Sequence, residues 1–190
     1  MKLLLIILTT ITFYGCDIFD TRDAETPDQT RSNYTTPSER TTLIQNLINS
    51  FSDKNANNYV KTFSDPNITG RVFRFAPSSV ALSSFQIWGN WNTNDELQYF
   101  NNLINKVPEE LPISLNFDTE EYGPVISDSA SYSAAYTLVV PQLNSNSRVY
   151  EGNINFTMFR DAGGVWSVIF WEDISIPEAT SWSELKGLEY

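Results

Sequence analysis

The residues best suited to chemistry in this 190-residue chain are Asp128, Tyr132 and Tyr136. The tyrosines follow the aspartate along a predicted strand, and a buried carboxylate beside a phenol can have a raised pKa and abstract a proton. Asp128 also follows Ser127 at the entrance of that strand, where an aspartate commonly lies in a solvated turn. Catalysis therefore requires Asp128 to lie in a cavity, and a position on the outer rim would exclude it.

Other kinds of reactive site are limited by composition. The chain has no histidine, which excludes Ser-His and Cys-His nucleophiles and His-ligated metals. The acidic pairs Glu109-Glu110, Glu120-Glu121 and Glu172-Asp173 consist of neighbours that would point to opposite faces of a strand. We interpret them as solvated acids and predict neither a metal site nor a cofactor. The net charge of -11 also argues against a nucleic-acid partner, because phosphate contacts need a basic surface.

Aromatic side chains are the remaining candidates for a binding site. In a connecting segment they could line a ligand cavity, or they could plug the end of a hydrophobic core. The residues of a candidate cavity are Tyr59, Trp88, Trp91, Tyr99, Asp128, Tyr132 and Tyr136.

The first fifteen residues have the order of an export signal. Lys2 precedes the apolar run 3–8, and a weaker run leads to Gly15-Cys16. The apolar stretch is shorter than the roughly 20 residues that a membrane-spanning helix needs. We therefore expect residues 1–15 to be removed.

Gly15-Cys16 resembles the end of a bacterial lipoprotein signal peptide. The resemblance implies that Cys16 becomes the mature N-terminus, diacylated on its sulfur and acylated on its amine. Three acyl chains would hold the protein on the membrane, with the outer membrane favoured and the side, periplasmic or surface-exposed, left open. The alternative is an ordinary secretory signal with an unrelated cysteine. Residues 16–36 are polar and predict a flexible tether.

Three helices are predicted beyond the tether. Thr36-Pro37-Ser38-Glu39 has the pattern of a capping box, and residues 43–51 continue it with an apolar stripe. A shorter helix at 56–63 ends before Asp65-Pro66, which makes a helical hairpin. After a short strand near 72–75 and an irregular stretch, a second capping box at 93–96 predicts a third helix. Its expected buried face is Leu97, Phe100, Ile104 and Val107.

The second half of the chain alternates with the period of a strand. Strands are predicted at 113–118, 129–140, 149–160 and 165–171, and the last three form an antiparallel meander. Strict alternation in the last strand places Val165, Ser167, Ile169 and Trp171 on one face, and Trp166, Val168 and Phe170 on the other.

This order of elements resembles the NTF2-like (SnoaL-like) superfamily. The resemblance rests on the hairpin 36–64, on Asp128-Ser129-Ala130 and on the strand 164–171. It implies an α+β fold in which three N-terminal helices pack on a curved antiparallel sheet, with the domain covering residues 37–190. The tail 180–187 resembles envelope lipoproteins of this fold, and it predicts a capped helical turn whose Trp182 and Leu185 seal the edge of the domain.

The superfamily includes cavity enzymes and members that only bind or scaffold, so fold alone decides no function. We expect a lipid-anchored envelope protein that binds or assembles without catalysis, its partner being an unknown protein or a small apolar ligand. The alternative is an isomerase-like or dehydratase-like cavity enzyme with Asp128 as the base and Tyr132 or Tyr136 as its partner. The resemblance also implies a homodimer through the outer sheet face, where Ser129, Ser131 and Ser133 are polar.

Overall fold

The computed structural model describes residues 33–143 and 145–190. The predicted signal peptide, Cys16 and most of the tether lie outside the described residues. Thr35, just before the predicted start of the domain at residue 37, is hydrogen-bonded to the first helix. Its N–H donates to Asn46 Oδ1 at 3.1 Å, and Asn46 Nδ2 donates to the Thr35 carbonyl at 2.6 Å.

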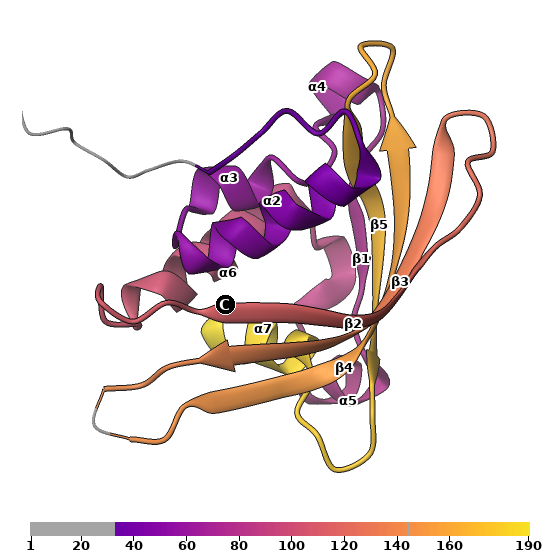
Figure 1. Cartoon of the computed structure of the whole chain (residues 1–190). Coiled ribbons are helices and arrows are strands. Elements are labelled where there is room, and N and C mark those ends of the chain that lie inside the picture. Colours follow the sequence, from indigo (N-terminus) through magenta and orange to yellow (C-terminus); the bar gives the residue numbers. More distant parts are fainter. Residues whose placement is uncertain (1–32, 144) are drawn as a thin grey trace, which may run out of the picture.

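Helices and a curved sheet form two layers (Figure 1). Helices α2 (Arg40–Ser52), α3 (Ala56–Val60) and α6 (Thr93–Asn105) cover one face of the sheet. The C-terminal helix α7 (Trp182–Glu189) packs against α5, α6 and β4. The remaining helical segments are α4 (Pro66–Thr69), α5 (Ser79–Ser84) and the single 3₁₀ turn η2 (Trp88–Asn90).

The sheet has five strands in the order β1-β5-β4-β3-β2. The long strands β2 (Ser114–Tyr122), β3 (Ser129–Val140), β4 (Arg148–Arg160) and β5 (Trp166–Ser175) pair antiparallel. The short strand β1 (Arg74–Ala76) adds a parallel pairing to β5. Helices followed by a mostly antiparallel sheet confirm the predicted α+β class.

Two predicted helix starts are corrected by the structure. The first helix begins at Arg40 with Glu39 as N-cap, and no side chain caps it, so the Thr36 capping box is not formed. The third helix has a capping box one residue earlier than predicted, between Asn92 and Asp95. Glu96 is therefore free of the cap, and the buried residues of α6 are Glu96, Tyr99, Phe100 and Leu103. Of the predicted face, Phe100 and Val107 are buried, whereas Leu97 and Ile104 are half-buried.

The last strand departs from strict alternation because it contains a β-bulge. Thr157 of β4 is paired with Phe170 and Met158 with Val168, which leaves Ile169 as the extra residue. The predicted faces are therefore wrong beyond Val168: Trp171 is buried like Trp166 and Val168, whereas Phe170 is half-buried. The bulge also turns Asp173 inward, and that side chain is only 2% exposed.

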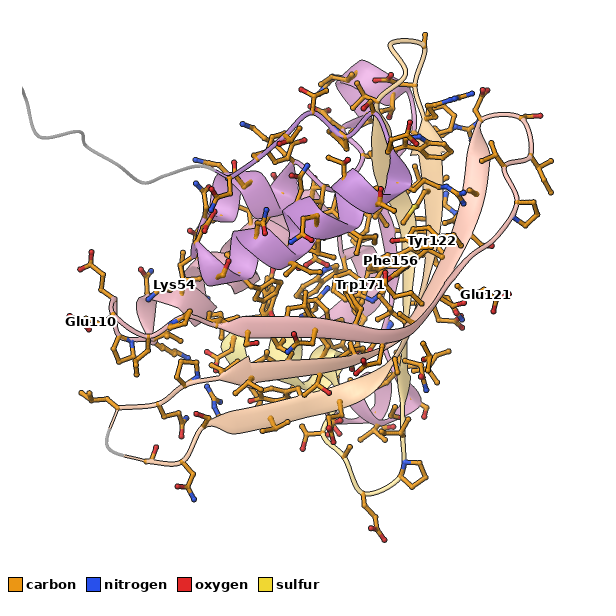
Figure 2. The ribbon with its side chains drawn as sticks, in the orientation of Figure 1. Lys54, Glu110, Glu121, Tyr122, Phe156 and Trp171 are labelled. Atoms are coloured by element: carbon orange, nitrogen blue, oxygen red, sulfur yellow. The ribbon has the colours of Figure 1, made fainter. Side chains whose placement is uncertain are left out.

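Side chains from both layers fill the space between helices and sheet. Phe156 and Trp171 lie there, whereas Glu110 and Glu121 point away from it (Figure 2). The four glutamates at 109, 110, 120 and 121 are exposed, as solvated acids would be. The prediction for the third acidic pair is wrong, since Asp173 is buried.

Candidate functional site

The interior of the cone is the first candidate site, and α7 fills it. Ser181 and Glu184 form a capping box that starts this helix. The Trp182 ring then packs edge-on against Trp171, Phe51 and Tyr136, with centroid distances of 4.6, 5.3 and 5.4 Å. Trp182 therefore occupies the centre of the core, whereas the sequence predicted that it would seal the edge.

A glycine lets the helix approach its neighbour closely. A Cβ atom at Gly187 would collide with the Phe85 ring. Any side chain at this position would push α7 away from the segment after α5. The close contact between Gly187 and Phe85 indicates that α7 is a fixed part of the packed interior.

A buried ion pair lies on the inner side of α7. The Lys186 ammonium is paired with Glu96 Oε1, and both side chains are fully buried. Tyr59 Oη donates to Glu96 Oε2 and Trp91 Nε1 donates to Glu96 Oε1, each at 2.7 Å. The carboxylate thus receives donors from three separate segments of the chain, which compensates much of the cost of burying its charge.

Aromatic rings surround the ammonium group. Lys186 Nζ lies 3.5 Å from the ring centroid of Trp171 and 3.7 Å from that of Phe75, as a cation–π contact requires. Burial lowers the pKa of Lys186 to about 8, against the attraction of Glu96, because the charged form has lost its water.

The second buried acid of the interior is Asp173. Tyr136 Oη donates to its Oδ1 at 2.8 Å, while the Ser183 N–H donates to Oδ2 at 2.7 Å and the Ser183 hydroxyl donates to the same oxygen. Burial raises the pKa of Asp173, and the hydrogen bonds from Ser183 and Tyr136 act in the opposite direction. Asp173 therefore ties the start of α7 to β5.

The end of α7 is held by a third acid. Glu189 accepts from Lys106 Nζ at 2.5 Å and from Arg148 at 3.0 Å. Asn102 Nδ2 donates to the Glu189 carbonyl at 2.8 Å. Ionic and hydrogen-bonded contacts thus fix α7 at its start, middle and end.

Six of the seven predicted cavity residues are buried in this packed interior rather than around an open space. Two of them form hydrogen bonds within the interior. Tyr99 Oη accepts from Trp182 Nε1 at 3.0 Å, and Trp88 Nε1 donates to the Ala81 carbonyl at 3.0 Å. The buried six are Tyr59, Trp88, Trp91, Tyr99, Tyr132 and Tyr136.

The seventh residue, Asp128, is exposed on the outer rim. It lies in a turn closed by a bridge between Ile126 and Ser129, outside the strand that carries the tyrosines. Tyr132 donates instead to Glu120 at 3.0 Å, and Tyr136 to Asp173. The structure therefore does not assemble the proposed base and its phenol, which corrects the hypothesis of catalysis by Asp128.

Sequence reasoning missed the four charged residues of the interior. Glu96, with Tyr99, Phe100 and Leu103, follows the i, i+3, i+4, i+7 spacing of a buried helix face. The same spacing holds for Trp182, Leu185, Lys186 and Glu189 in α7. Charges of opposite sign at apolar positions of two helices were the available signal for the Glu96–Lys186 pair. The sequence contains no comparable signal for the burial of Asp173, because no residue pattern in β5 predicts the bulge that turns this side chain inward.

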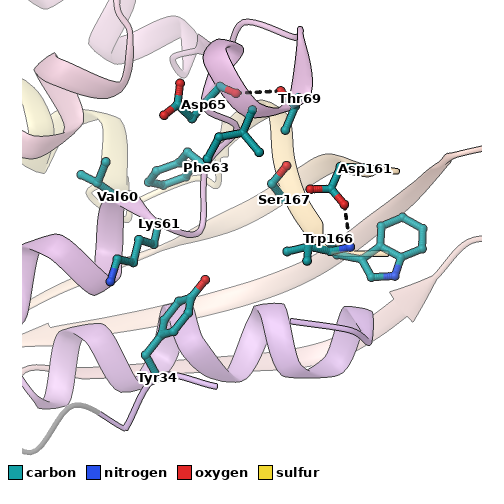
Figure 3. A pocket seen from close by; sticks show the side chains of 11 residues that line it. Tyr34, Val60, Lys61, Phe63, Asp65, Thr69, Asp161, Trp166 and Ser167 are labelled. Carbon is teal, nitrogen blue, oxygen red and sulfur yellow. Dashed lines mark hydrogen bonds between the residues drawn. The ribbon is translucent and has the colours of Figure 1, made fainter. Parts of the chain in front are cut away.

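A cavity of about 260 Å³ lies outside the cone, and we call it the outer pocket (Figure 3). It forms where the segment from α3 to α4 runs beside the start of β5, a contact made by the bridge between Phe63 and Val168. Its polar lining includes Lys61, Asp161 and Ser167.

The described residues contain no group of three Asp, Glu, Cys or His side chains arranged to hold a metal ion. In the same part of the chain, no helix combines the length and apolar character needed to cross a membrane.

Comparison with solved structures identifies the fold. A protein from Novosphingobium aromaticivorans, provisionally assigned as an aromatic ring hydroxylase, matches with a TM-score of 0.59 at 10% identity, over 77% of this chain and 92% of that one. NTF2-like proteins of unknown function from Shewanella oneidensis and Rhodospirillum rubrum match with TM-scores of 0.51 and 0.53. Their identities are 9% and 8%, over 71% and 73% of this chain and 95% and 98% of theirs.

The domain therefore has the NTF2-like fold, as the sequence resemblance predicted. Neither a protein-family model nor a curated protein sequence matches this chain. At such low identity the likeness extends to the fold alone.

Proposed function

We propose that this chain is a lipid-anchored protein of the cell envelope whose NTF2-like domain binds a ligand or partner without catalysing a reaction. The observation that carries the proposal is the closed interior, in which Lys186 of α7 and Glu96 of α6 are paired at zero exposure. A cavity enzyme needs space for substrate beside its acid or base. Here that space is taken by the chain's own C-terminal helix.

Chemical labelling of lysines tests whether the interior is closed. The folded protein is treated at pH 8 with an amine-reactive acetylating reagent, and the rates are followed by mass spectrometry. We expect Lys61, which is exposed, to react rapidly and Lys186 to react at least about 100-fold more slowly, because it reacts only after local unfolding. A neutral fraction of Lys186 at this pH would favour its reaction in an open site, so comparable rates would refute a closed interior.

The lipid anchor rests on Gly15-Cys16 at the end of the export signal. We expect a fatty-acid label to be incorporated in bacterial cells and to be lost in Cys16→Ala. Persistent labelling of the variant would contradict lipidation at Cys16, and fractionation of the labelled protein would assign inner or outer membrane.

Pairing of two copies through the outer sheet face is a further part of the proposal. That face carries small polar residues such as Ser131, Ser133 and Asn153, half-buried or exposed. Light scattering of the purified full chain in detergent would measure its mass. A monomeric mass at all concentrations would refute the proposed homodimer.

A further inference from the structure

The outer pocket combines apolar walls with polar groups at one end. Its apolar lining comes from α3, from the segment that follows it, from α4, from the turn before β5 and from the first residue of β5. These side chains are Val60, Phe63, Ile68, Val165 and Trp166. The volume of about 260 Å³ lies just below the range typical of small-molecule pockets, so the pocket suits a ligand with one ring or a short chain.

A buried hydroxyl without a partner lies in this lining. Ser167 is 7% exposed, and its Oγ makes no hydrogen bond within the described part of the chain. Arg148 Nε and Trp171 Nε1 are also buried without partners there, but of the three residues only Ser167 lines the outer pocket. An unpaired buried hydroxyl costs stability unless something outside the chain completes it.

The carboxylate of Asp161 faces the same end of the pocket. Its Oδ1 accepts from the Val165 N–H at 2.9 Å, which fixes the side chain against the turn before β5. The other carboxylate oxygen points toward Ser167 (Figure 3). Two oxygen acceptors thus converge on the pocket, and a ligand group with several N–H donors would satisfy both.

We propose that the outer pocket binds a small organic amine, with its ammonium group donating to Ser167 Oγ and Asp161 and its apolar body against Phe63. This inference deepens the proposed function, since it names the class of ligand that the non-catalytic domain would take.

The charges around the pocket favour a cation. Asp65 and Asp161 contribute two carboxylates against the single ammonium of Lys61. Lys61 itself lies over the Tyr34 ring, with Nζ 5.4 Å from the centroid, so its charge is held at the rim. The whole chain is also acidic, with a net charge of -11, and attracts cations over longer distances.

Calorimetric titration of the full chain in neutral detergent tests the proposal with 2-phenylethylamine as the probe. 2-Phenylethanol and phenylacetate serve as neutral and anionic analogues with the same ring. We expect the amine to bind with a dissociation constant on the order of 10⁻⁴ to 10⁻³ M, as its size allows. The alcohol should bind at least about tenfold more weakly, and the acid should not bind.

Two pairs of variants locate the site. Asp161→Asn keeps an oxygen for the Val165 N–H but removes the charge, and should weaken amine binding by about tenfold or more. Ser167→Ala should weaken it by about three- to tenfold. The matched controls are Asp128→Asn in an exposed turn and Ser133→Ala on the outer sheet face, both with unchanged affinity.

Absence of amine binding up to about 10 mM would overturn the inference, because that concentration is about tenfold above the highest expected dissociation constant. The Ser167 hydroxyl would then be hydrogen-bonded to water rather than to a ligand. Equal binding of amine and acid, or equal affinity of Asp161→Asn and wild type, would overturn it as well. The labelling of Lys186 and the acylation of Cys16 do not depend on the outer pocket, so they distinguish failure of this inference from failure of the proposed function.

Discussion

The interior of the cone and the outer pocket use the same three residue types in opposite ways. Inside, Ser183 donates to Asp173, and Lys186 is paired with Glu96. In the outer pocket, Ser167 has no partner within the described residues. Its neighbour Asp161 uses one oxygen to hold a turn, and Lys61 is exposed.

The difference lies in which groups are satisfied by the chain itself. A buried polar group that finds all its partners within the chain rigidifies the fold and has nothing left to offer a ligand. A buried group that is left unpaired is a cost to folding that a ligand can remove. The same set of serine, acid and lysine is thus structural in one region and available for binding in the other.

The largest effect is expected from breaking the interior ion pair. Lys186→Met keeps much of the side-chain volume but leaves the Glu96 carboxylate buried without its cation. Removing one partner of a buried pair costs about 3 to 5 kcal/mol. Urea unfolding of the variant and the wild type, followed by tryptophan fluorescence, measures this loss.

The double variant Glu96→Gln/Lys186→Met sharpens the result. If the cost arises from an unpaired charge, removing both charges should cost less than the sum of the two single changes. Additive losses would instead indicate that the two residues act independently, which contradicts the contact between Lys186 Nζ and Glu96 Oε1.

Asparagine in place of each aspartate compares the two regions directly. Asp173→Asn replaces one of the oxygens that accept from Tyr136 and Ser183 by an amide donor, and should cost about 2 to 3 kcal/mol. Asp161→Asn keeps the acceptor for Val165 at a half-buried site and should cost less than about 1 kcal/mol. Equal losses in urea unfolding would remove the distinction between a structural and an available carboxylate.

Local patterns in the sequence predicted the fold class and the long strands. The alternation of residues 129–140 was sufficient because β3 is regular along its whole length and every second side chain, from Ala130 to Val140, points inward. Tyr132 and Tyr136 are among these inward-pointing side chains. The short parallel strand β1 was found as a strand, but its pairing with β5 depends on residues far apart in the chain.

The candidate site was less predictable, since its geometry depends on deviations from those patterns. One extra residue at Ile169 moves Trp171 and Asp173 to the inner face. A capping box shifted by one residue turns Glu96 from a cap into a core residue. The burial of Lys186 depends on α7 packing inside the curve of the sheet, and no local rule specifies that position.

The pH dependence of stability distinguishes the buried lysine from the exposed one. The unfolded chain keeps the proton of this lysine up to its ordinary pKa of 10.5, whereas folded Lys186 loses it near pH 8. Between these values the unfolded state binds more protons, so the free energy of unfolding should rise with pH, by up to about 3 kcal/mol. Tyr59 and Tyr99, with pKa values raised by burial, reverse the trend above pH 10, where unfolded tyrosines ionise first.

Urea unfolding at pH 7, 8, 9 and 10 measures this dependence. Lys186→Met should abolish the rise, and Lys61→Met, a change at an exposed lysine, should leave it unchanged. A rise that persists without Lys186 would assign the titration to another group.

The smallest effect should come from the serine of the outer pocket, and its sign is informative. Ser183→Ala removes a donor from buried Asp173 and should destabilise the domain by about 1 to 3 kcal/mol. Ser167→Ala removes a hydroxyl that has no partner within the described residues, so it should change stability by about 0.5 kcal/mol or less, or raise it slightly. A large loss in Ser167→Ala would show that the hydroxyl is already satisfied in the folded protein, and the outer pocket would then resemble the interior rather than contrast with it.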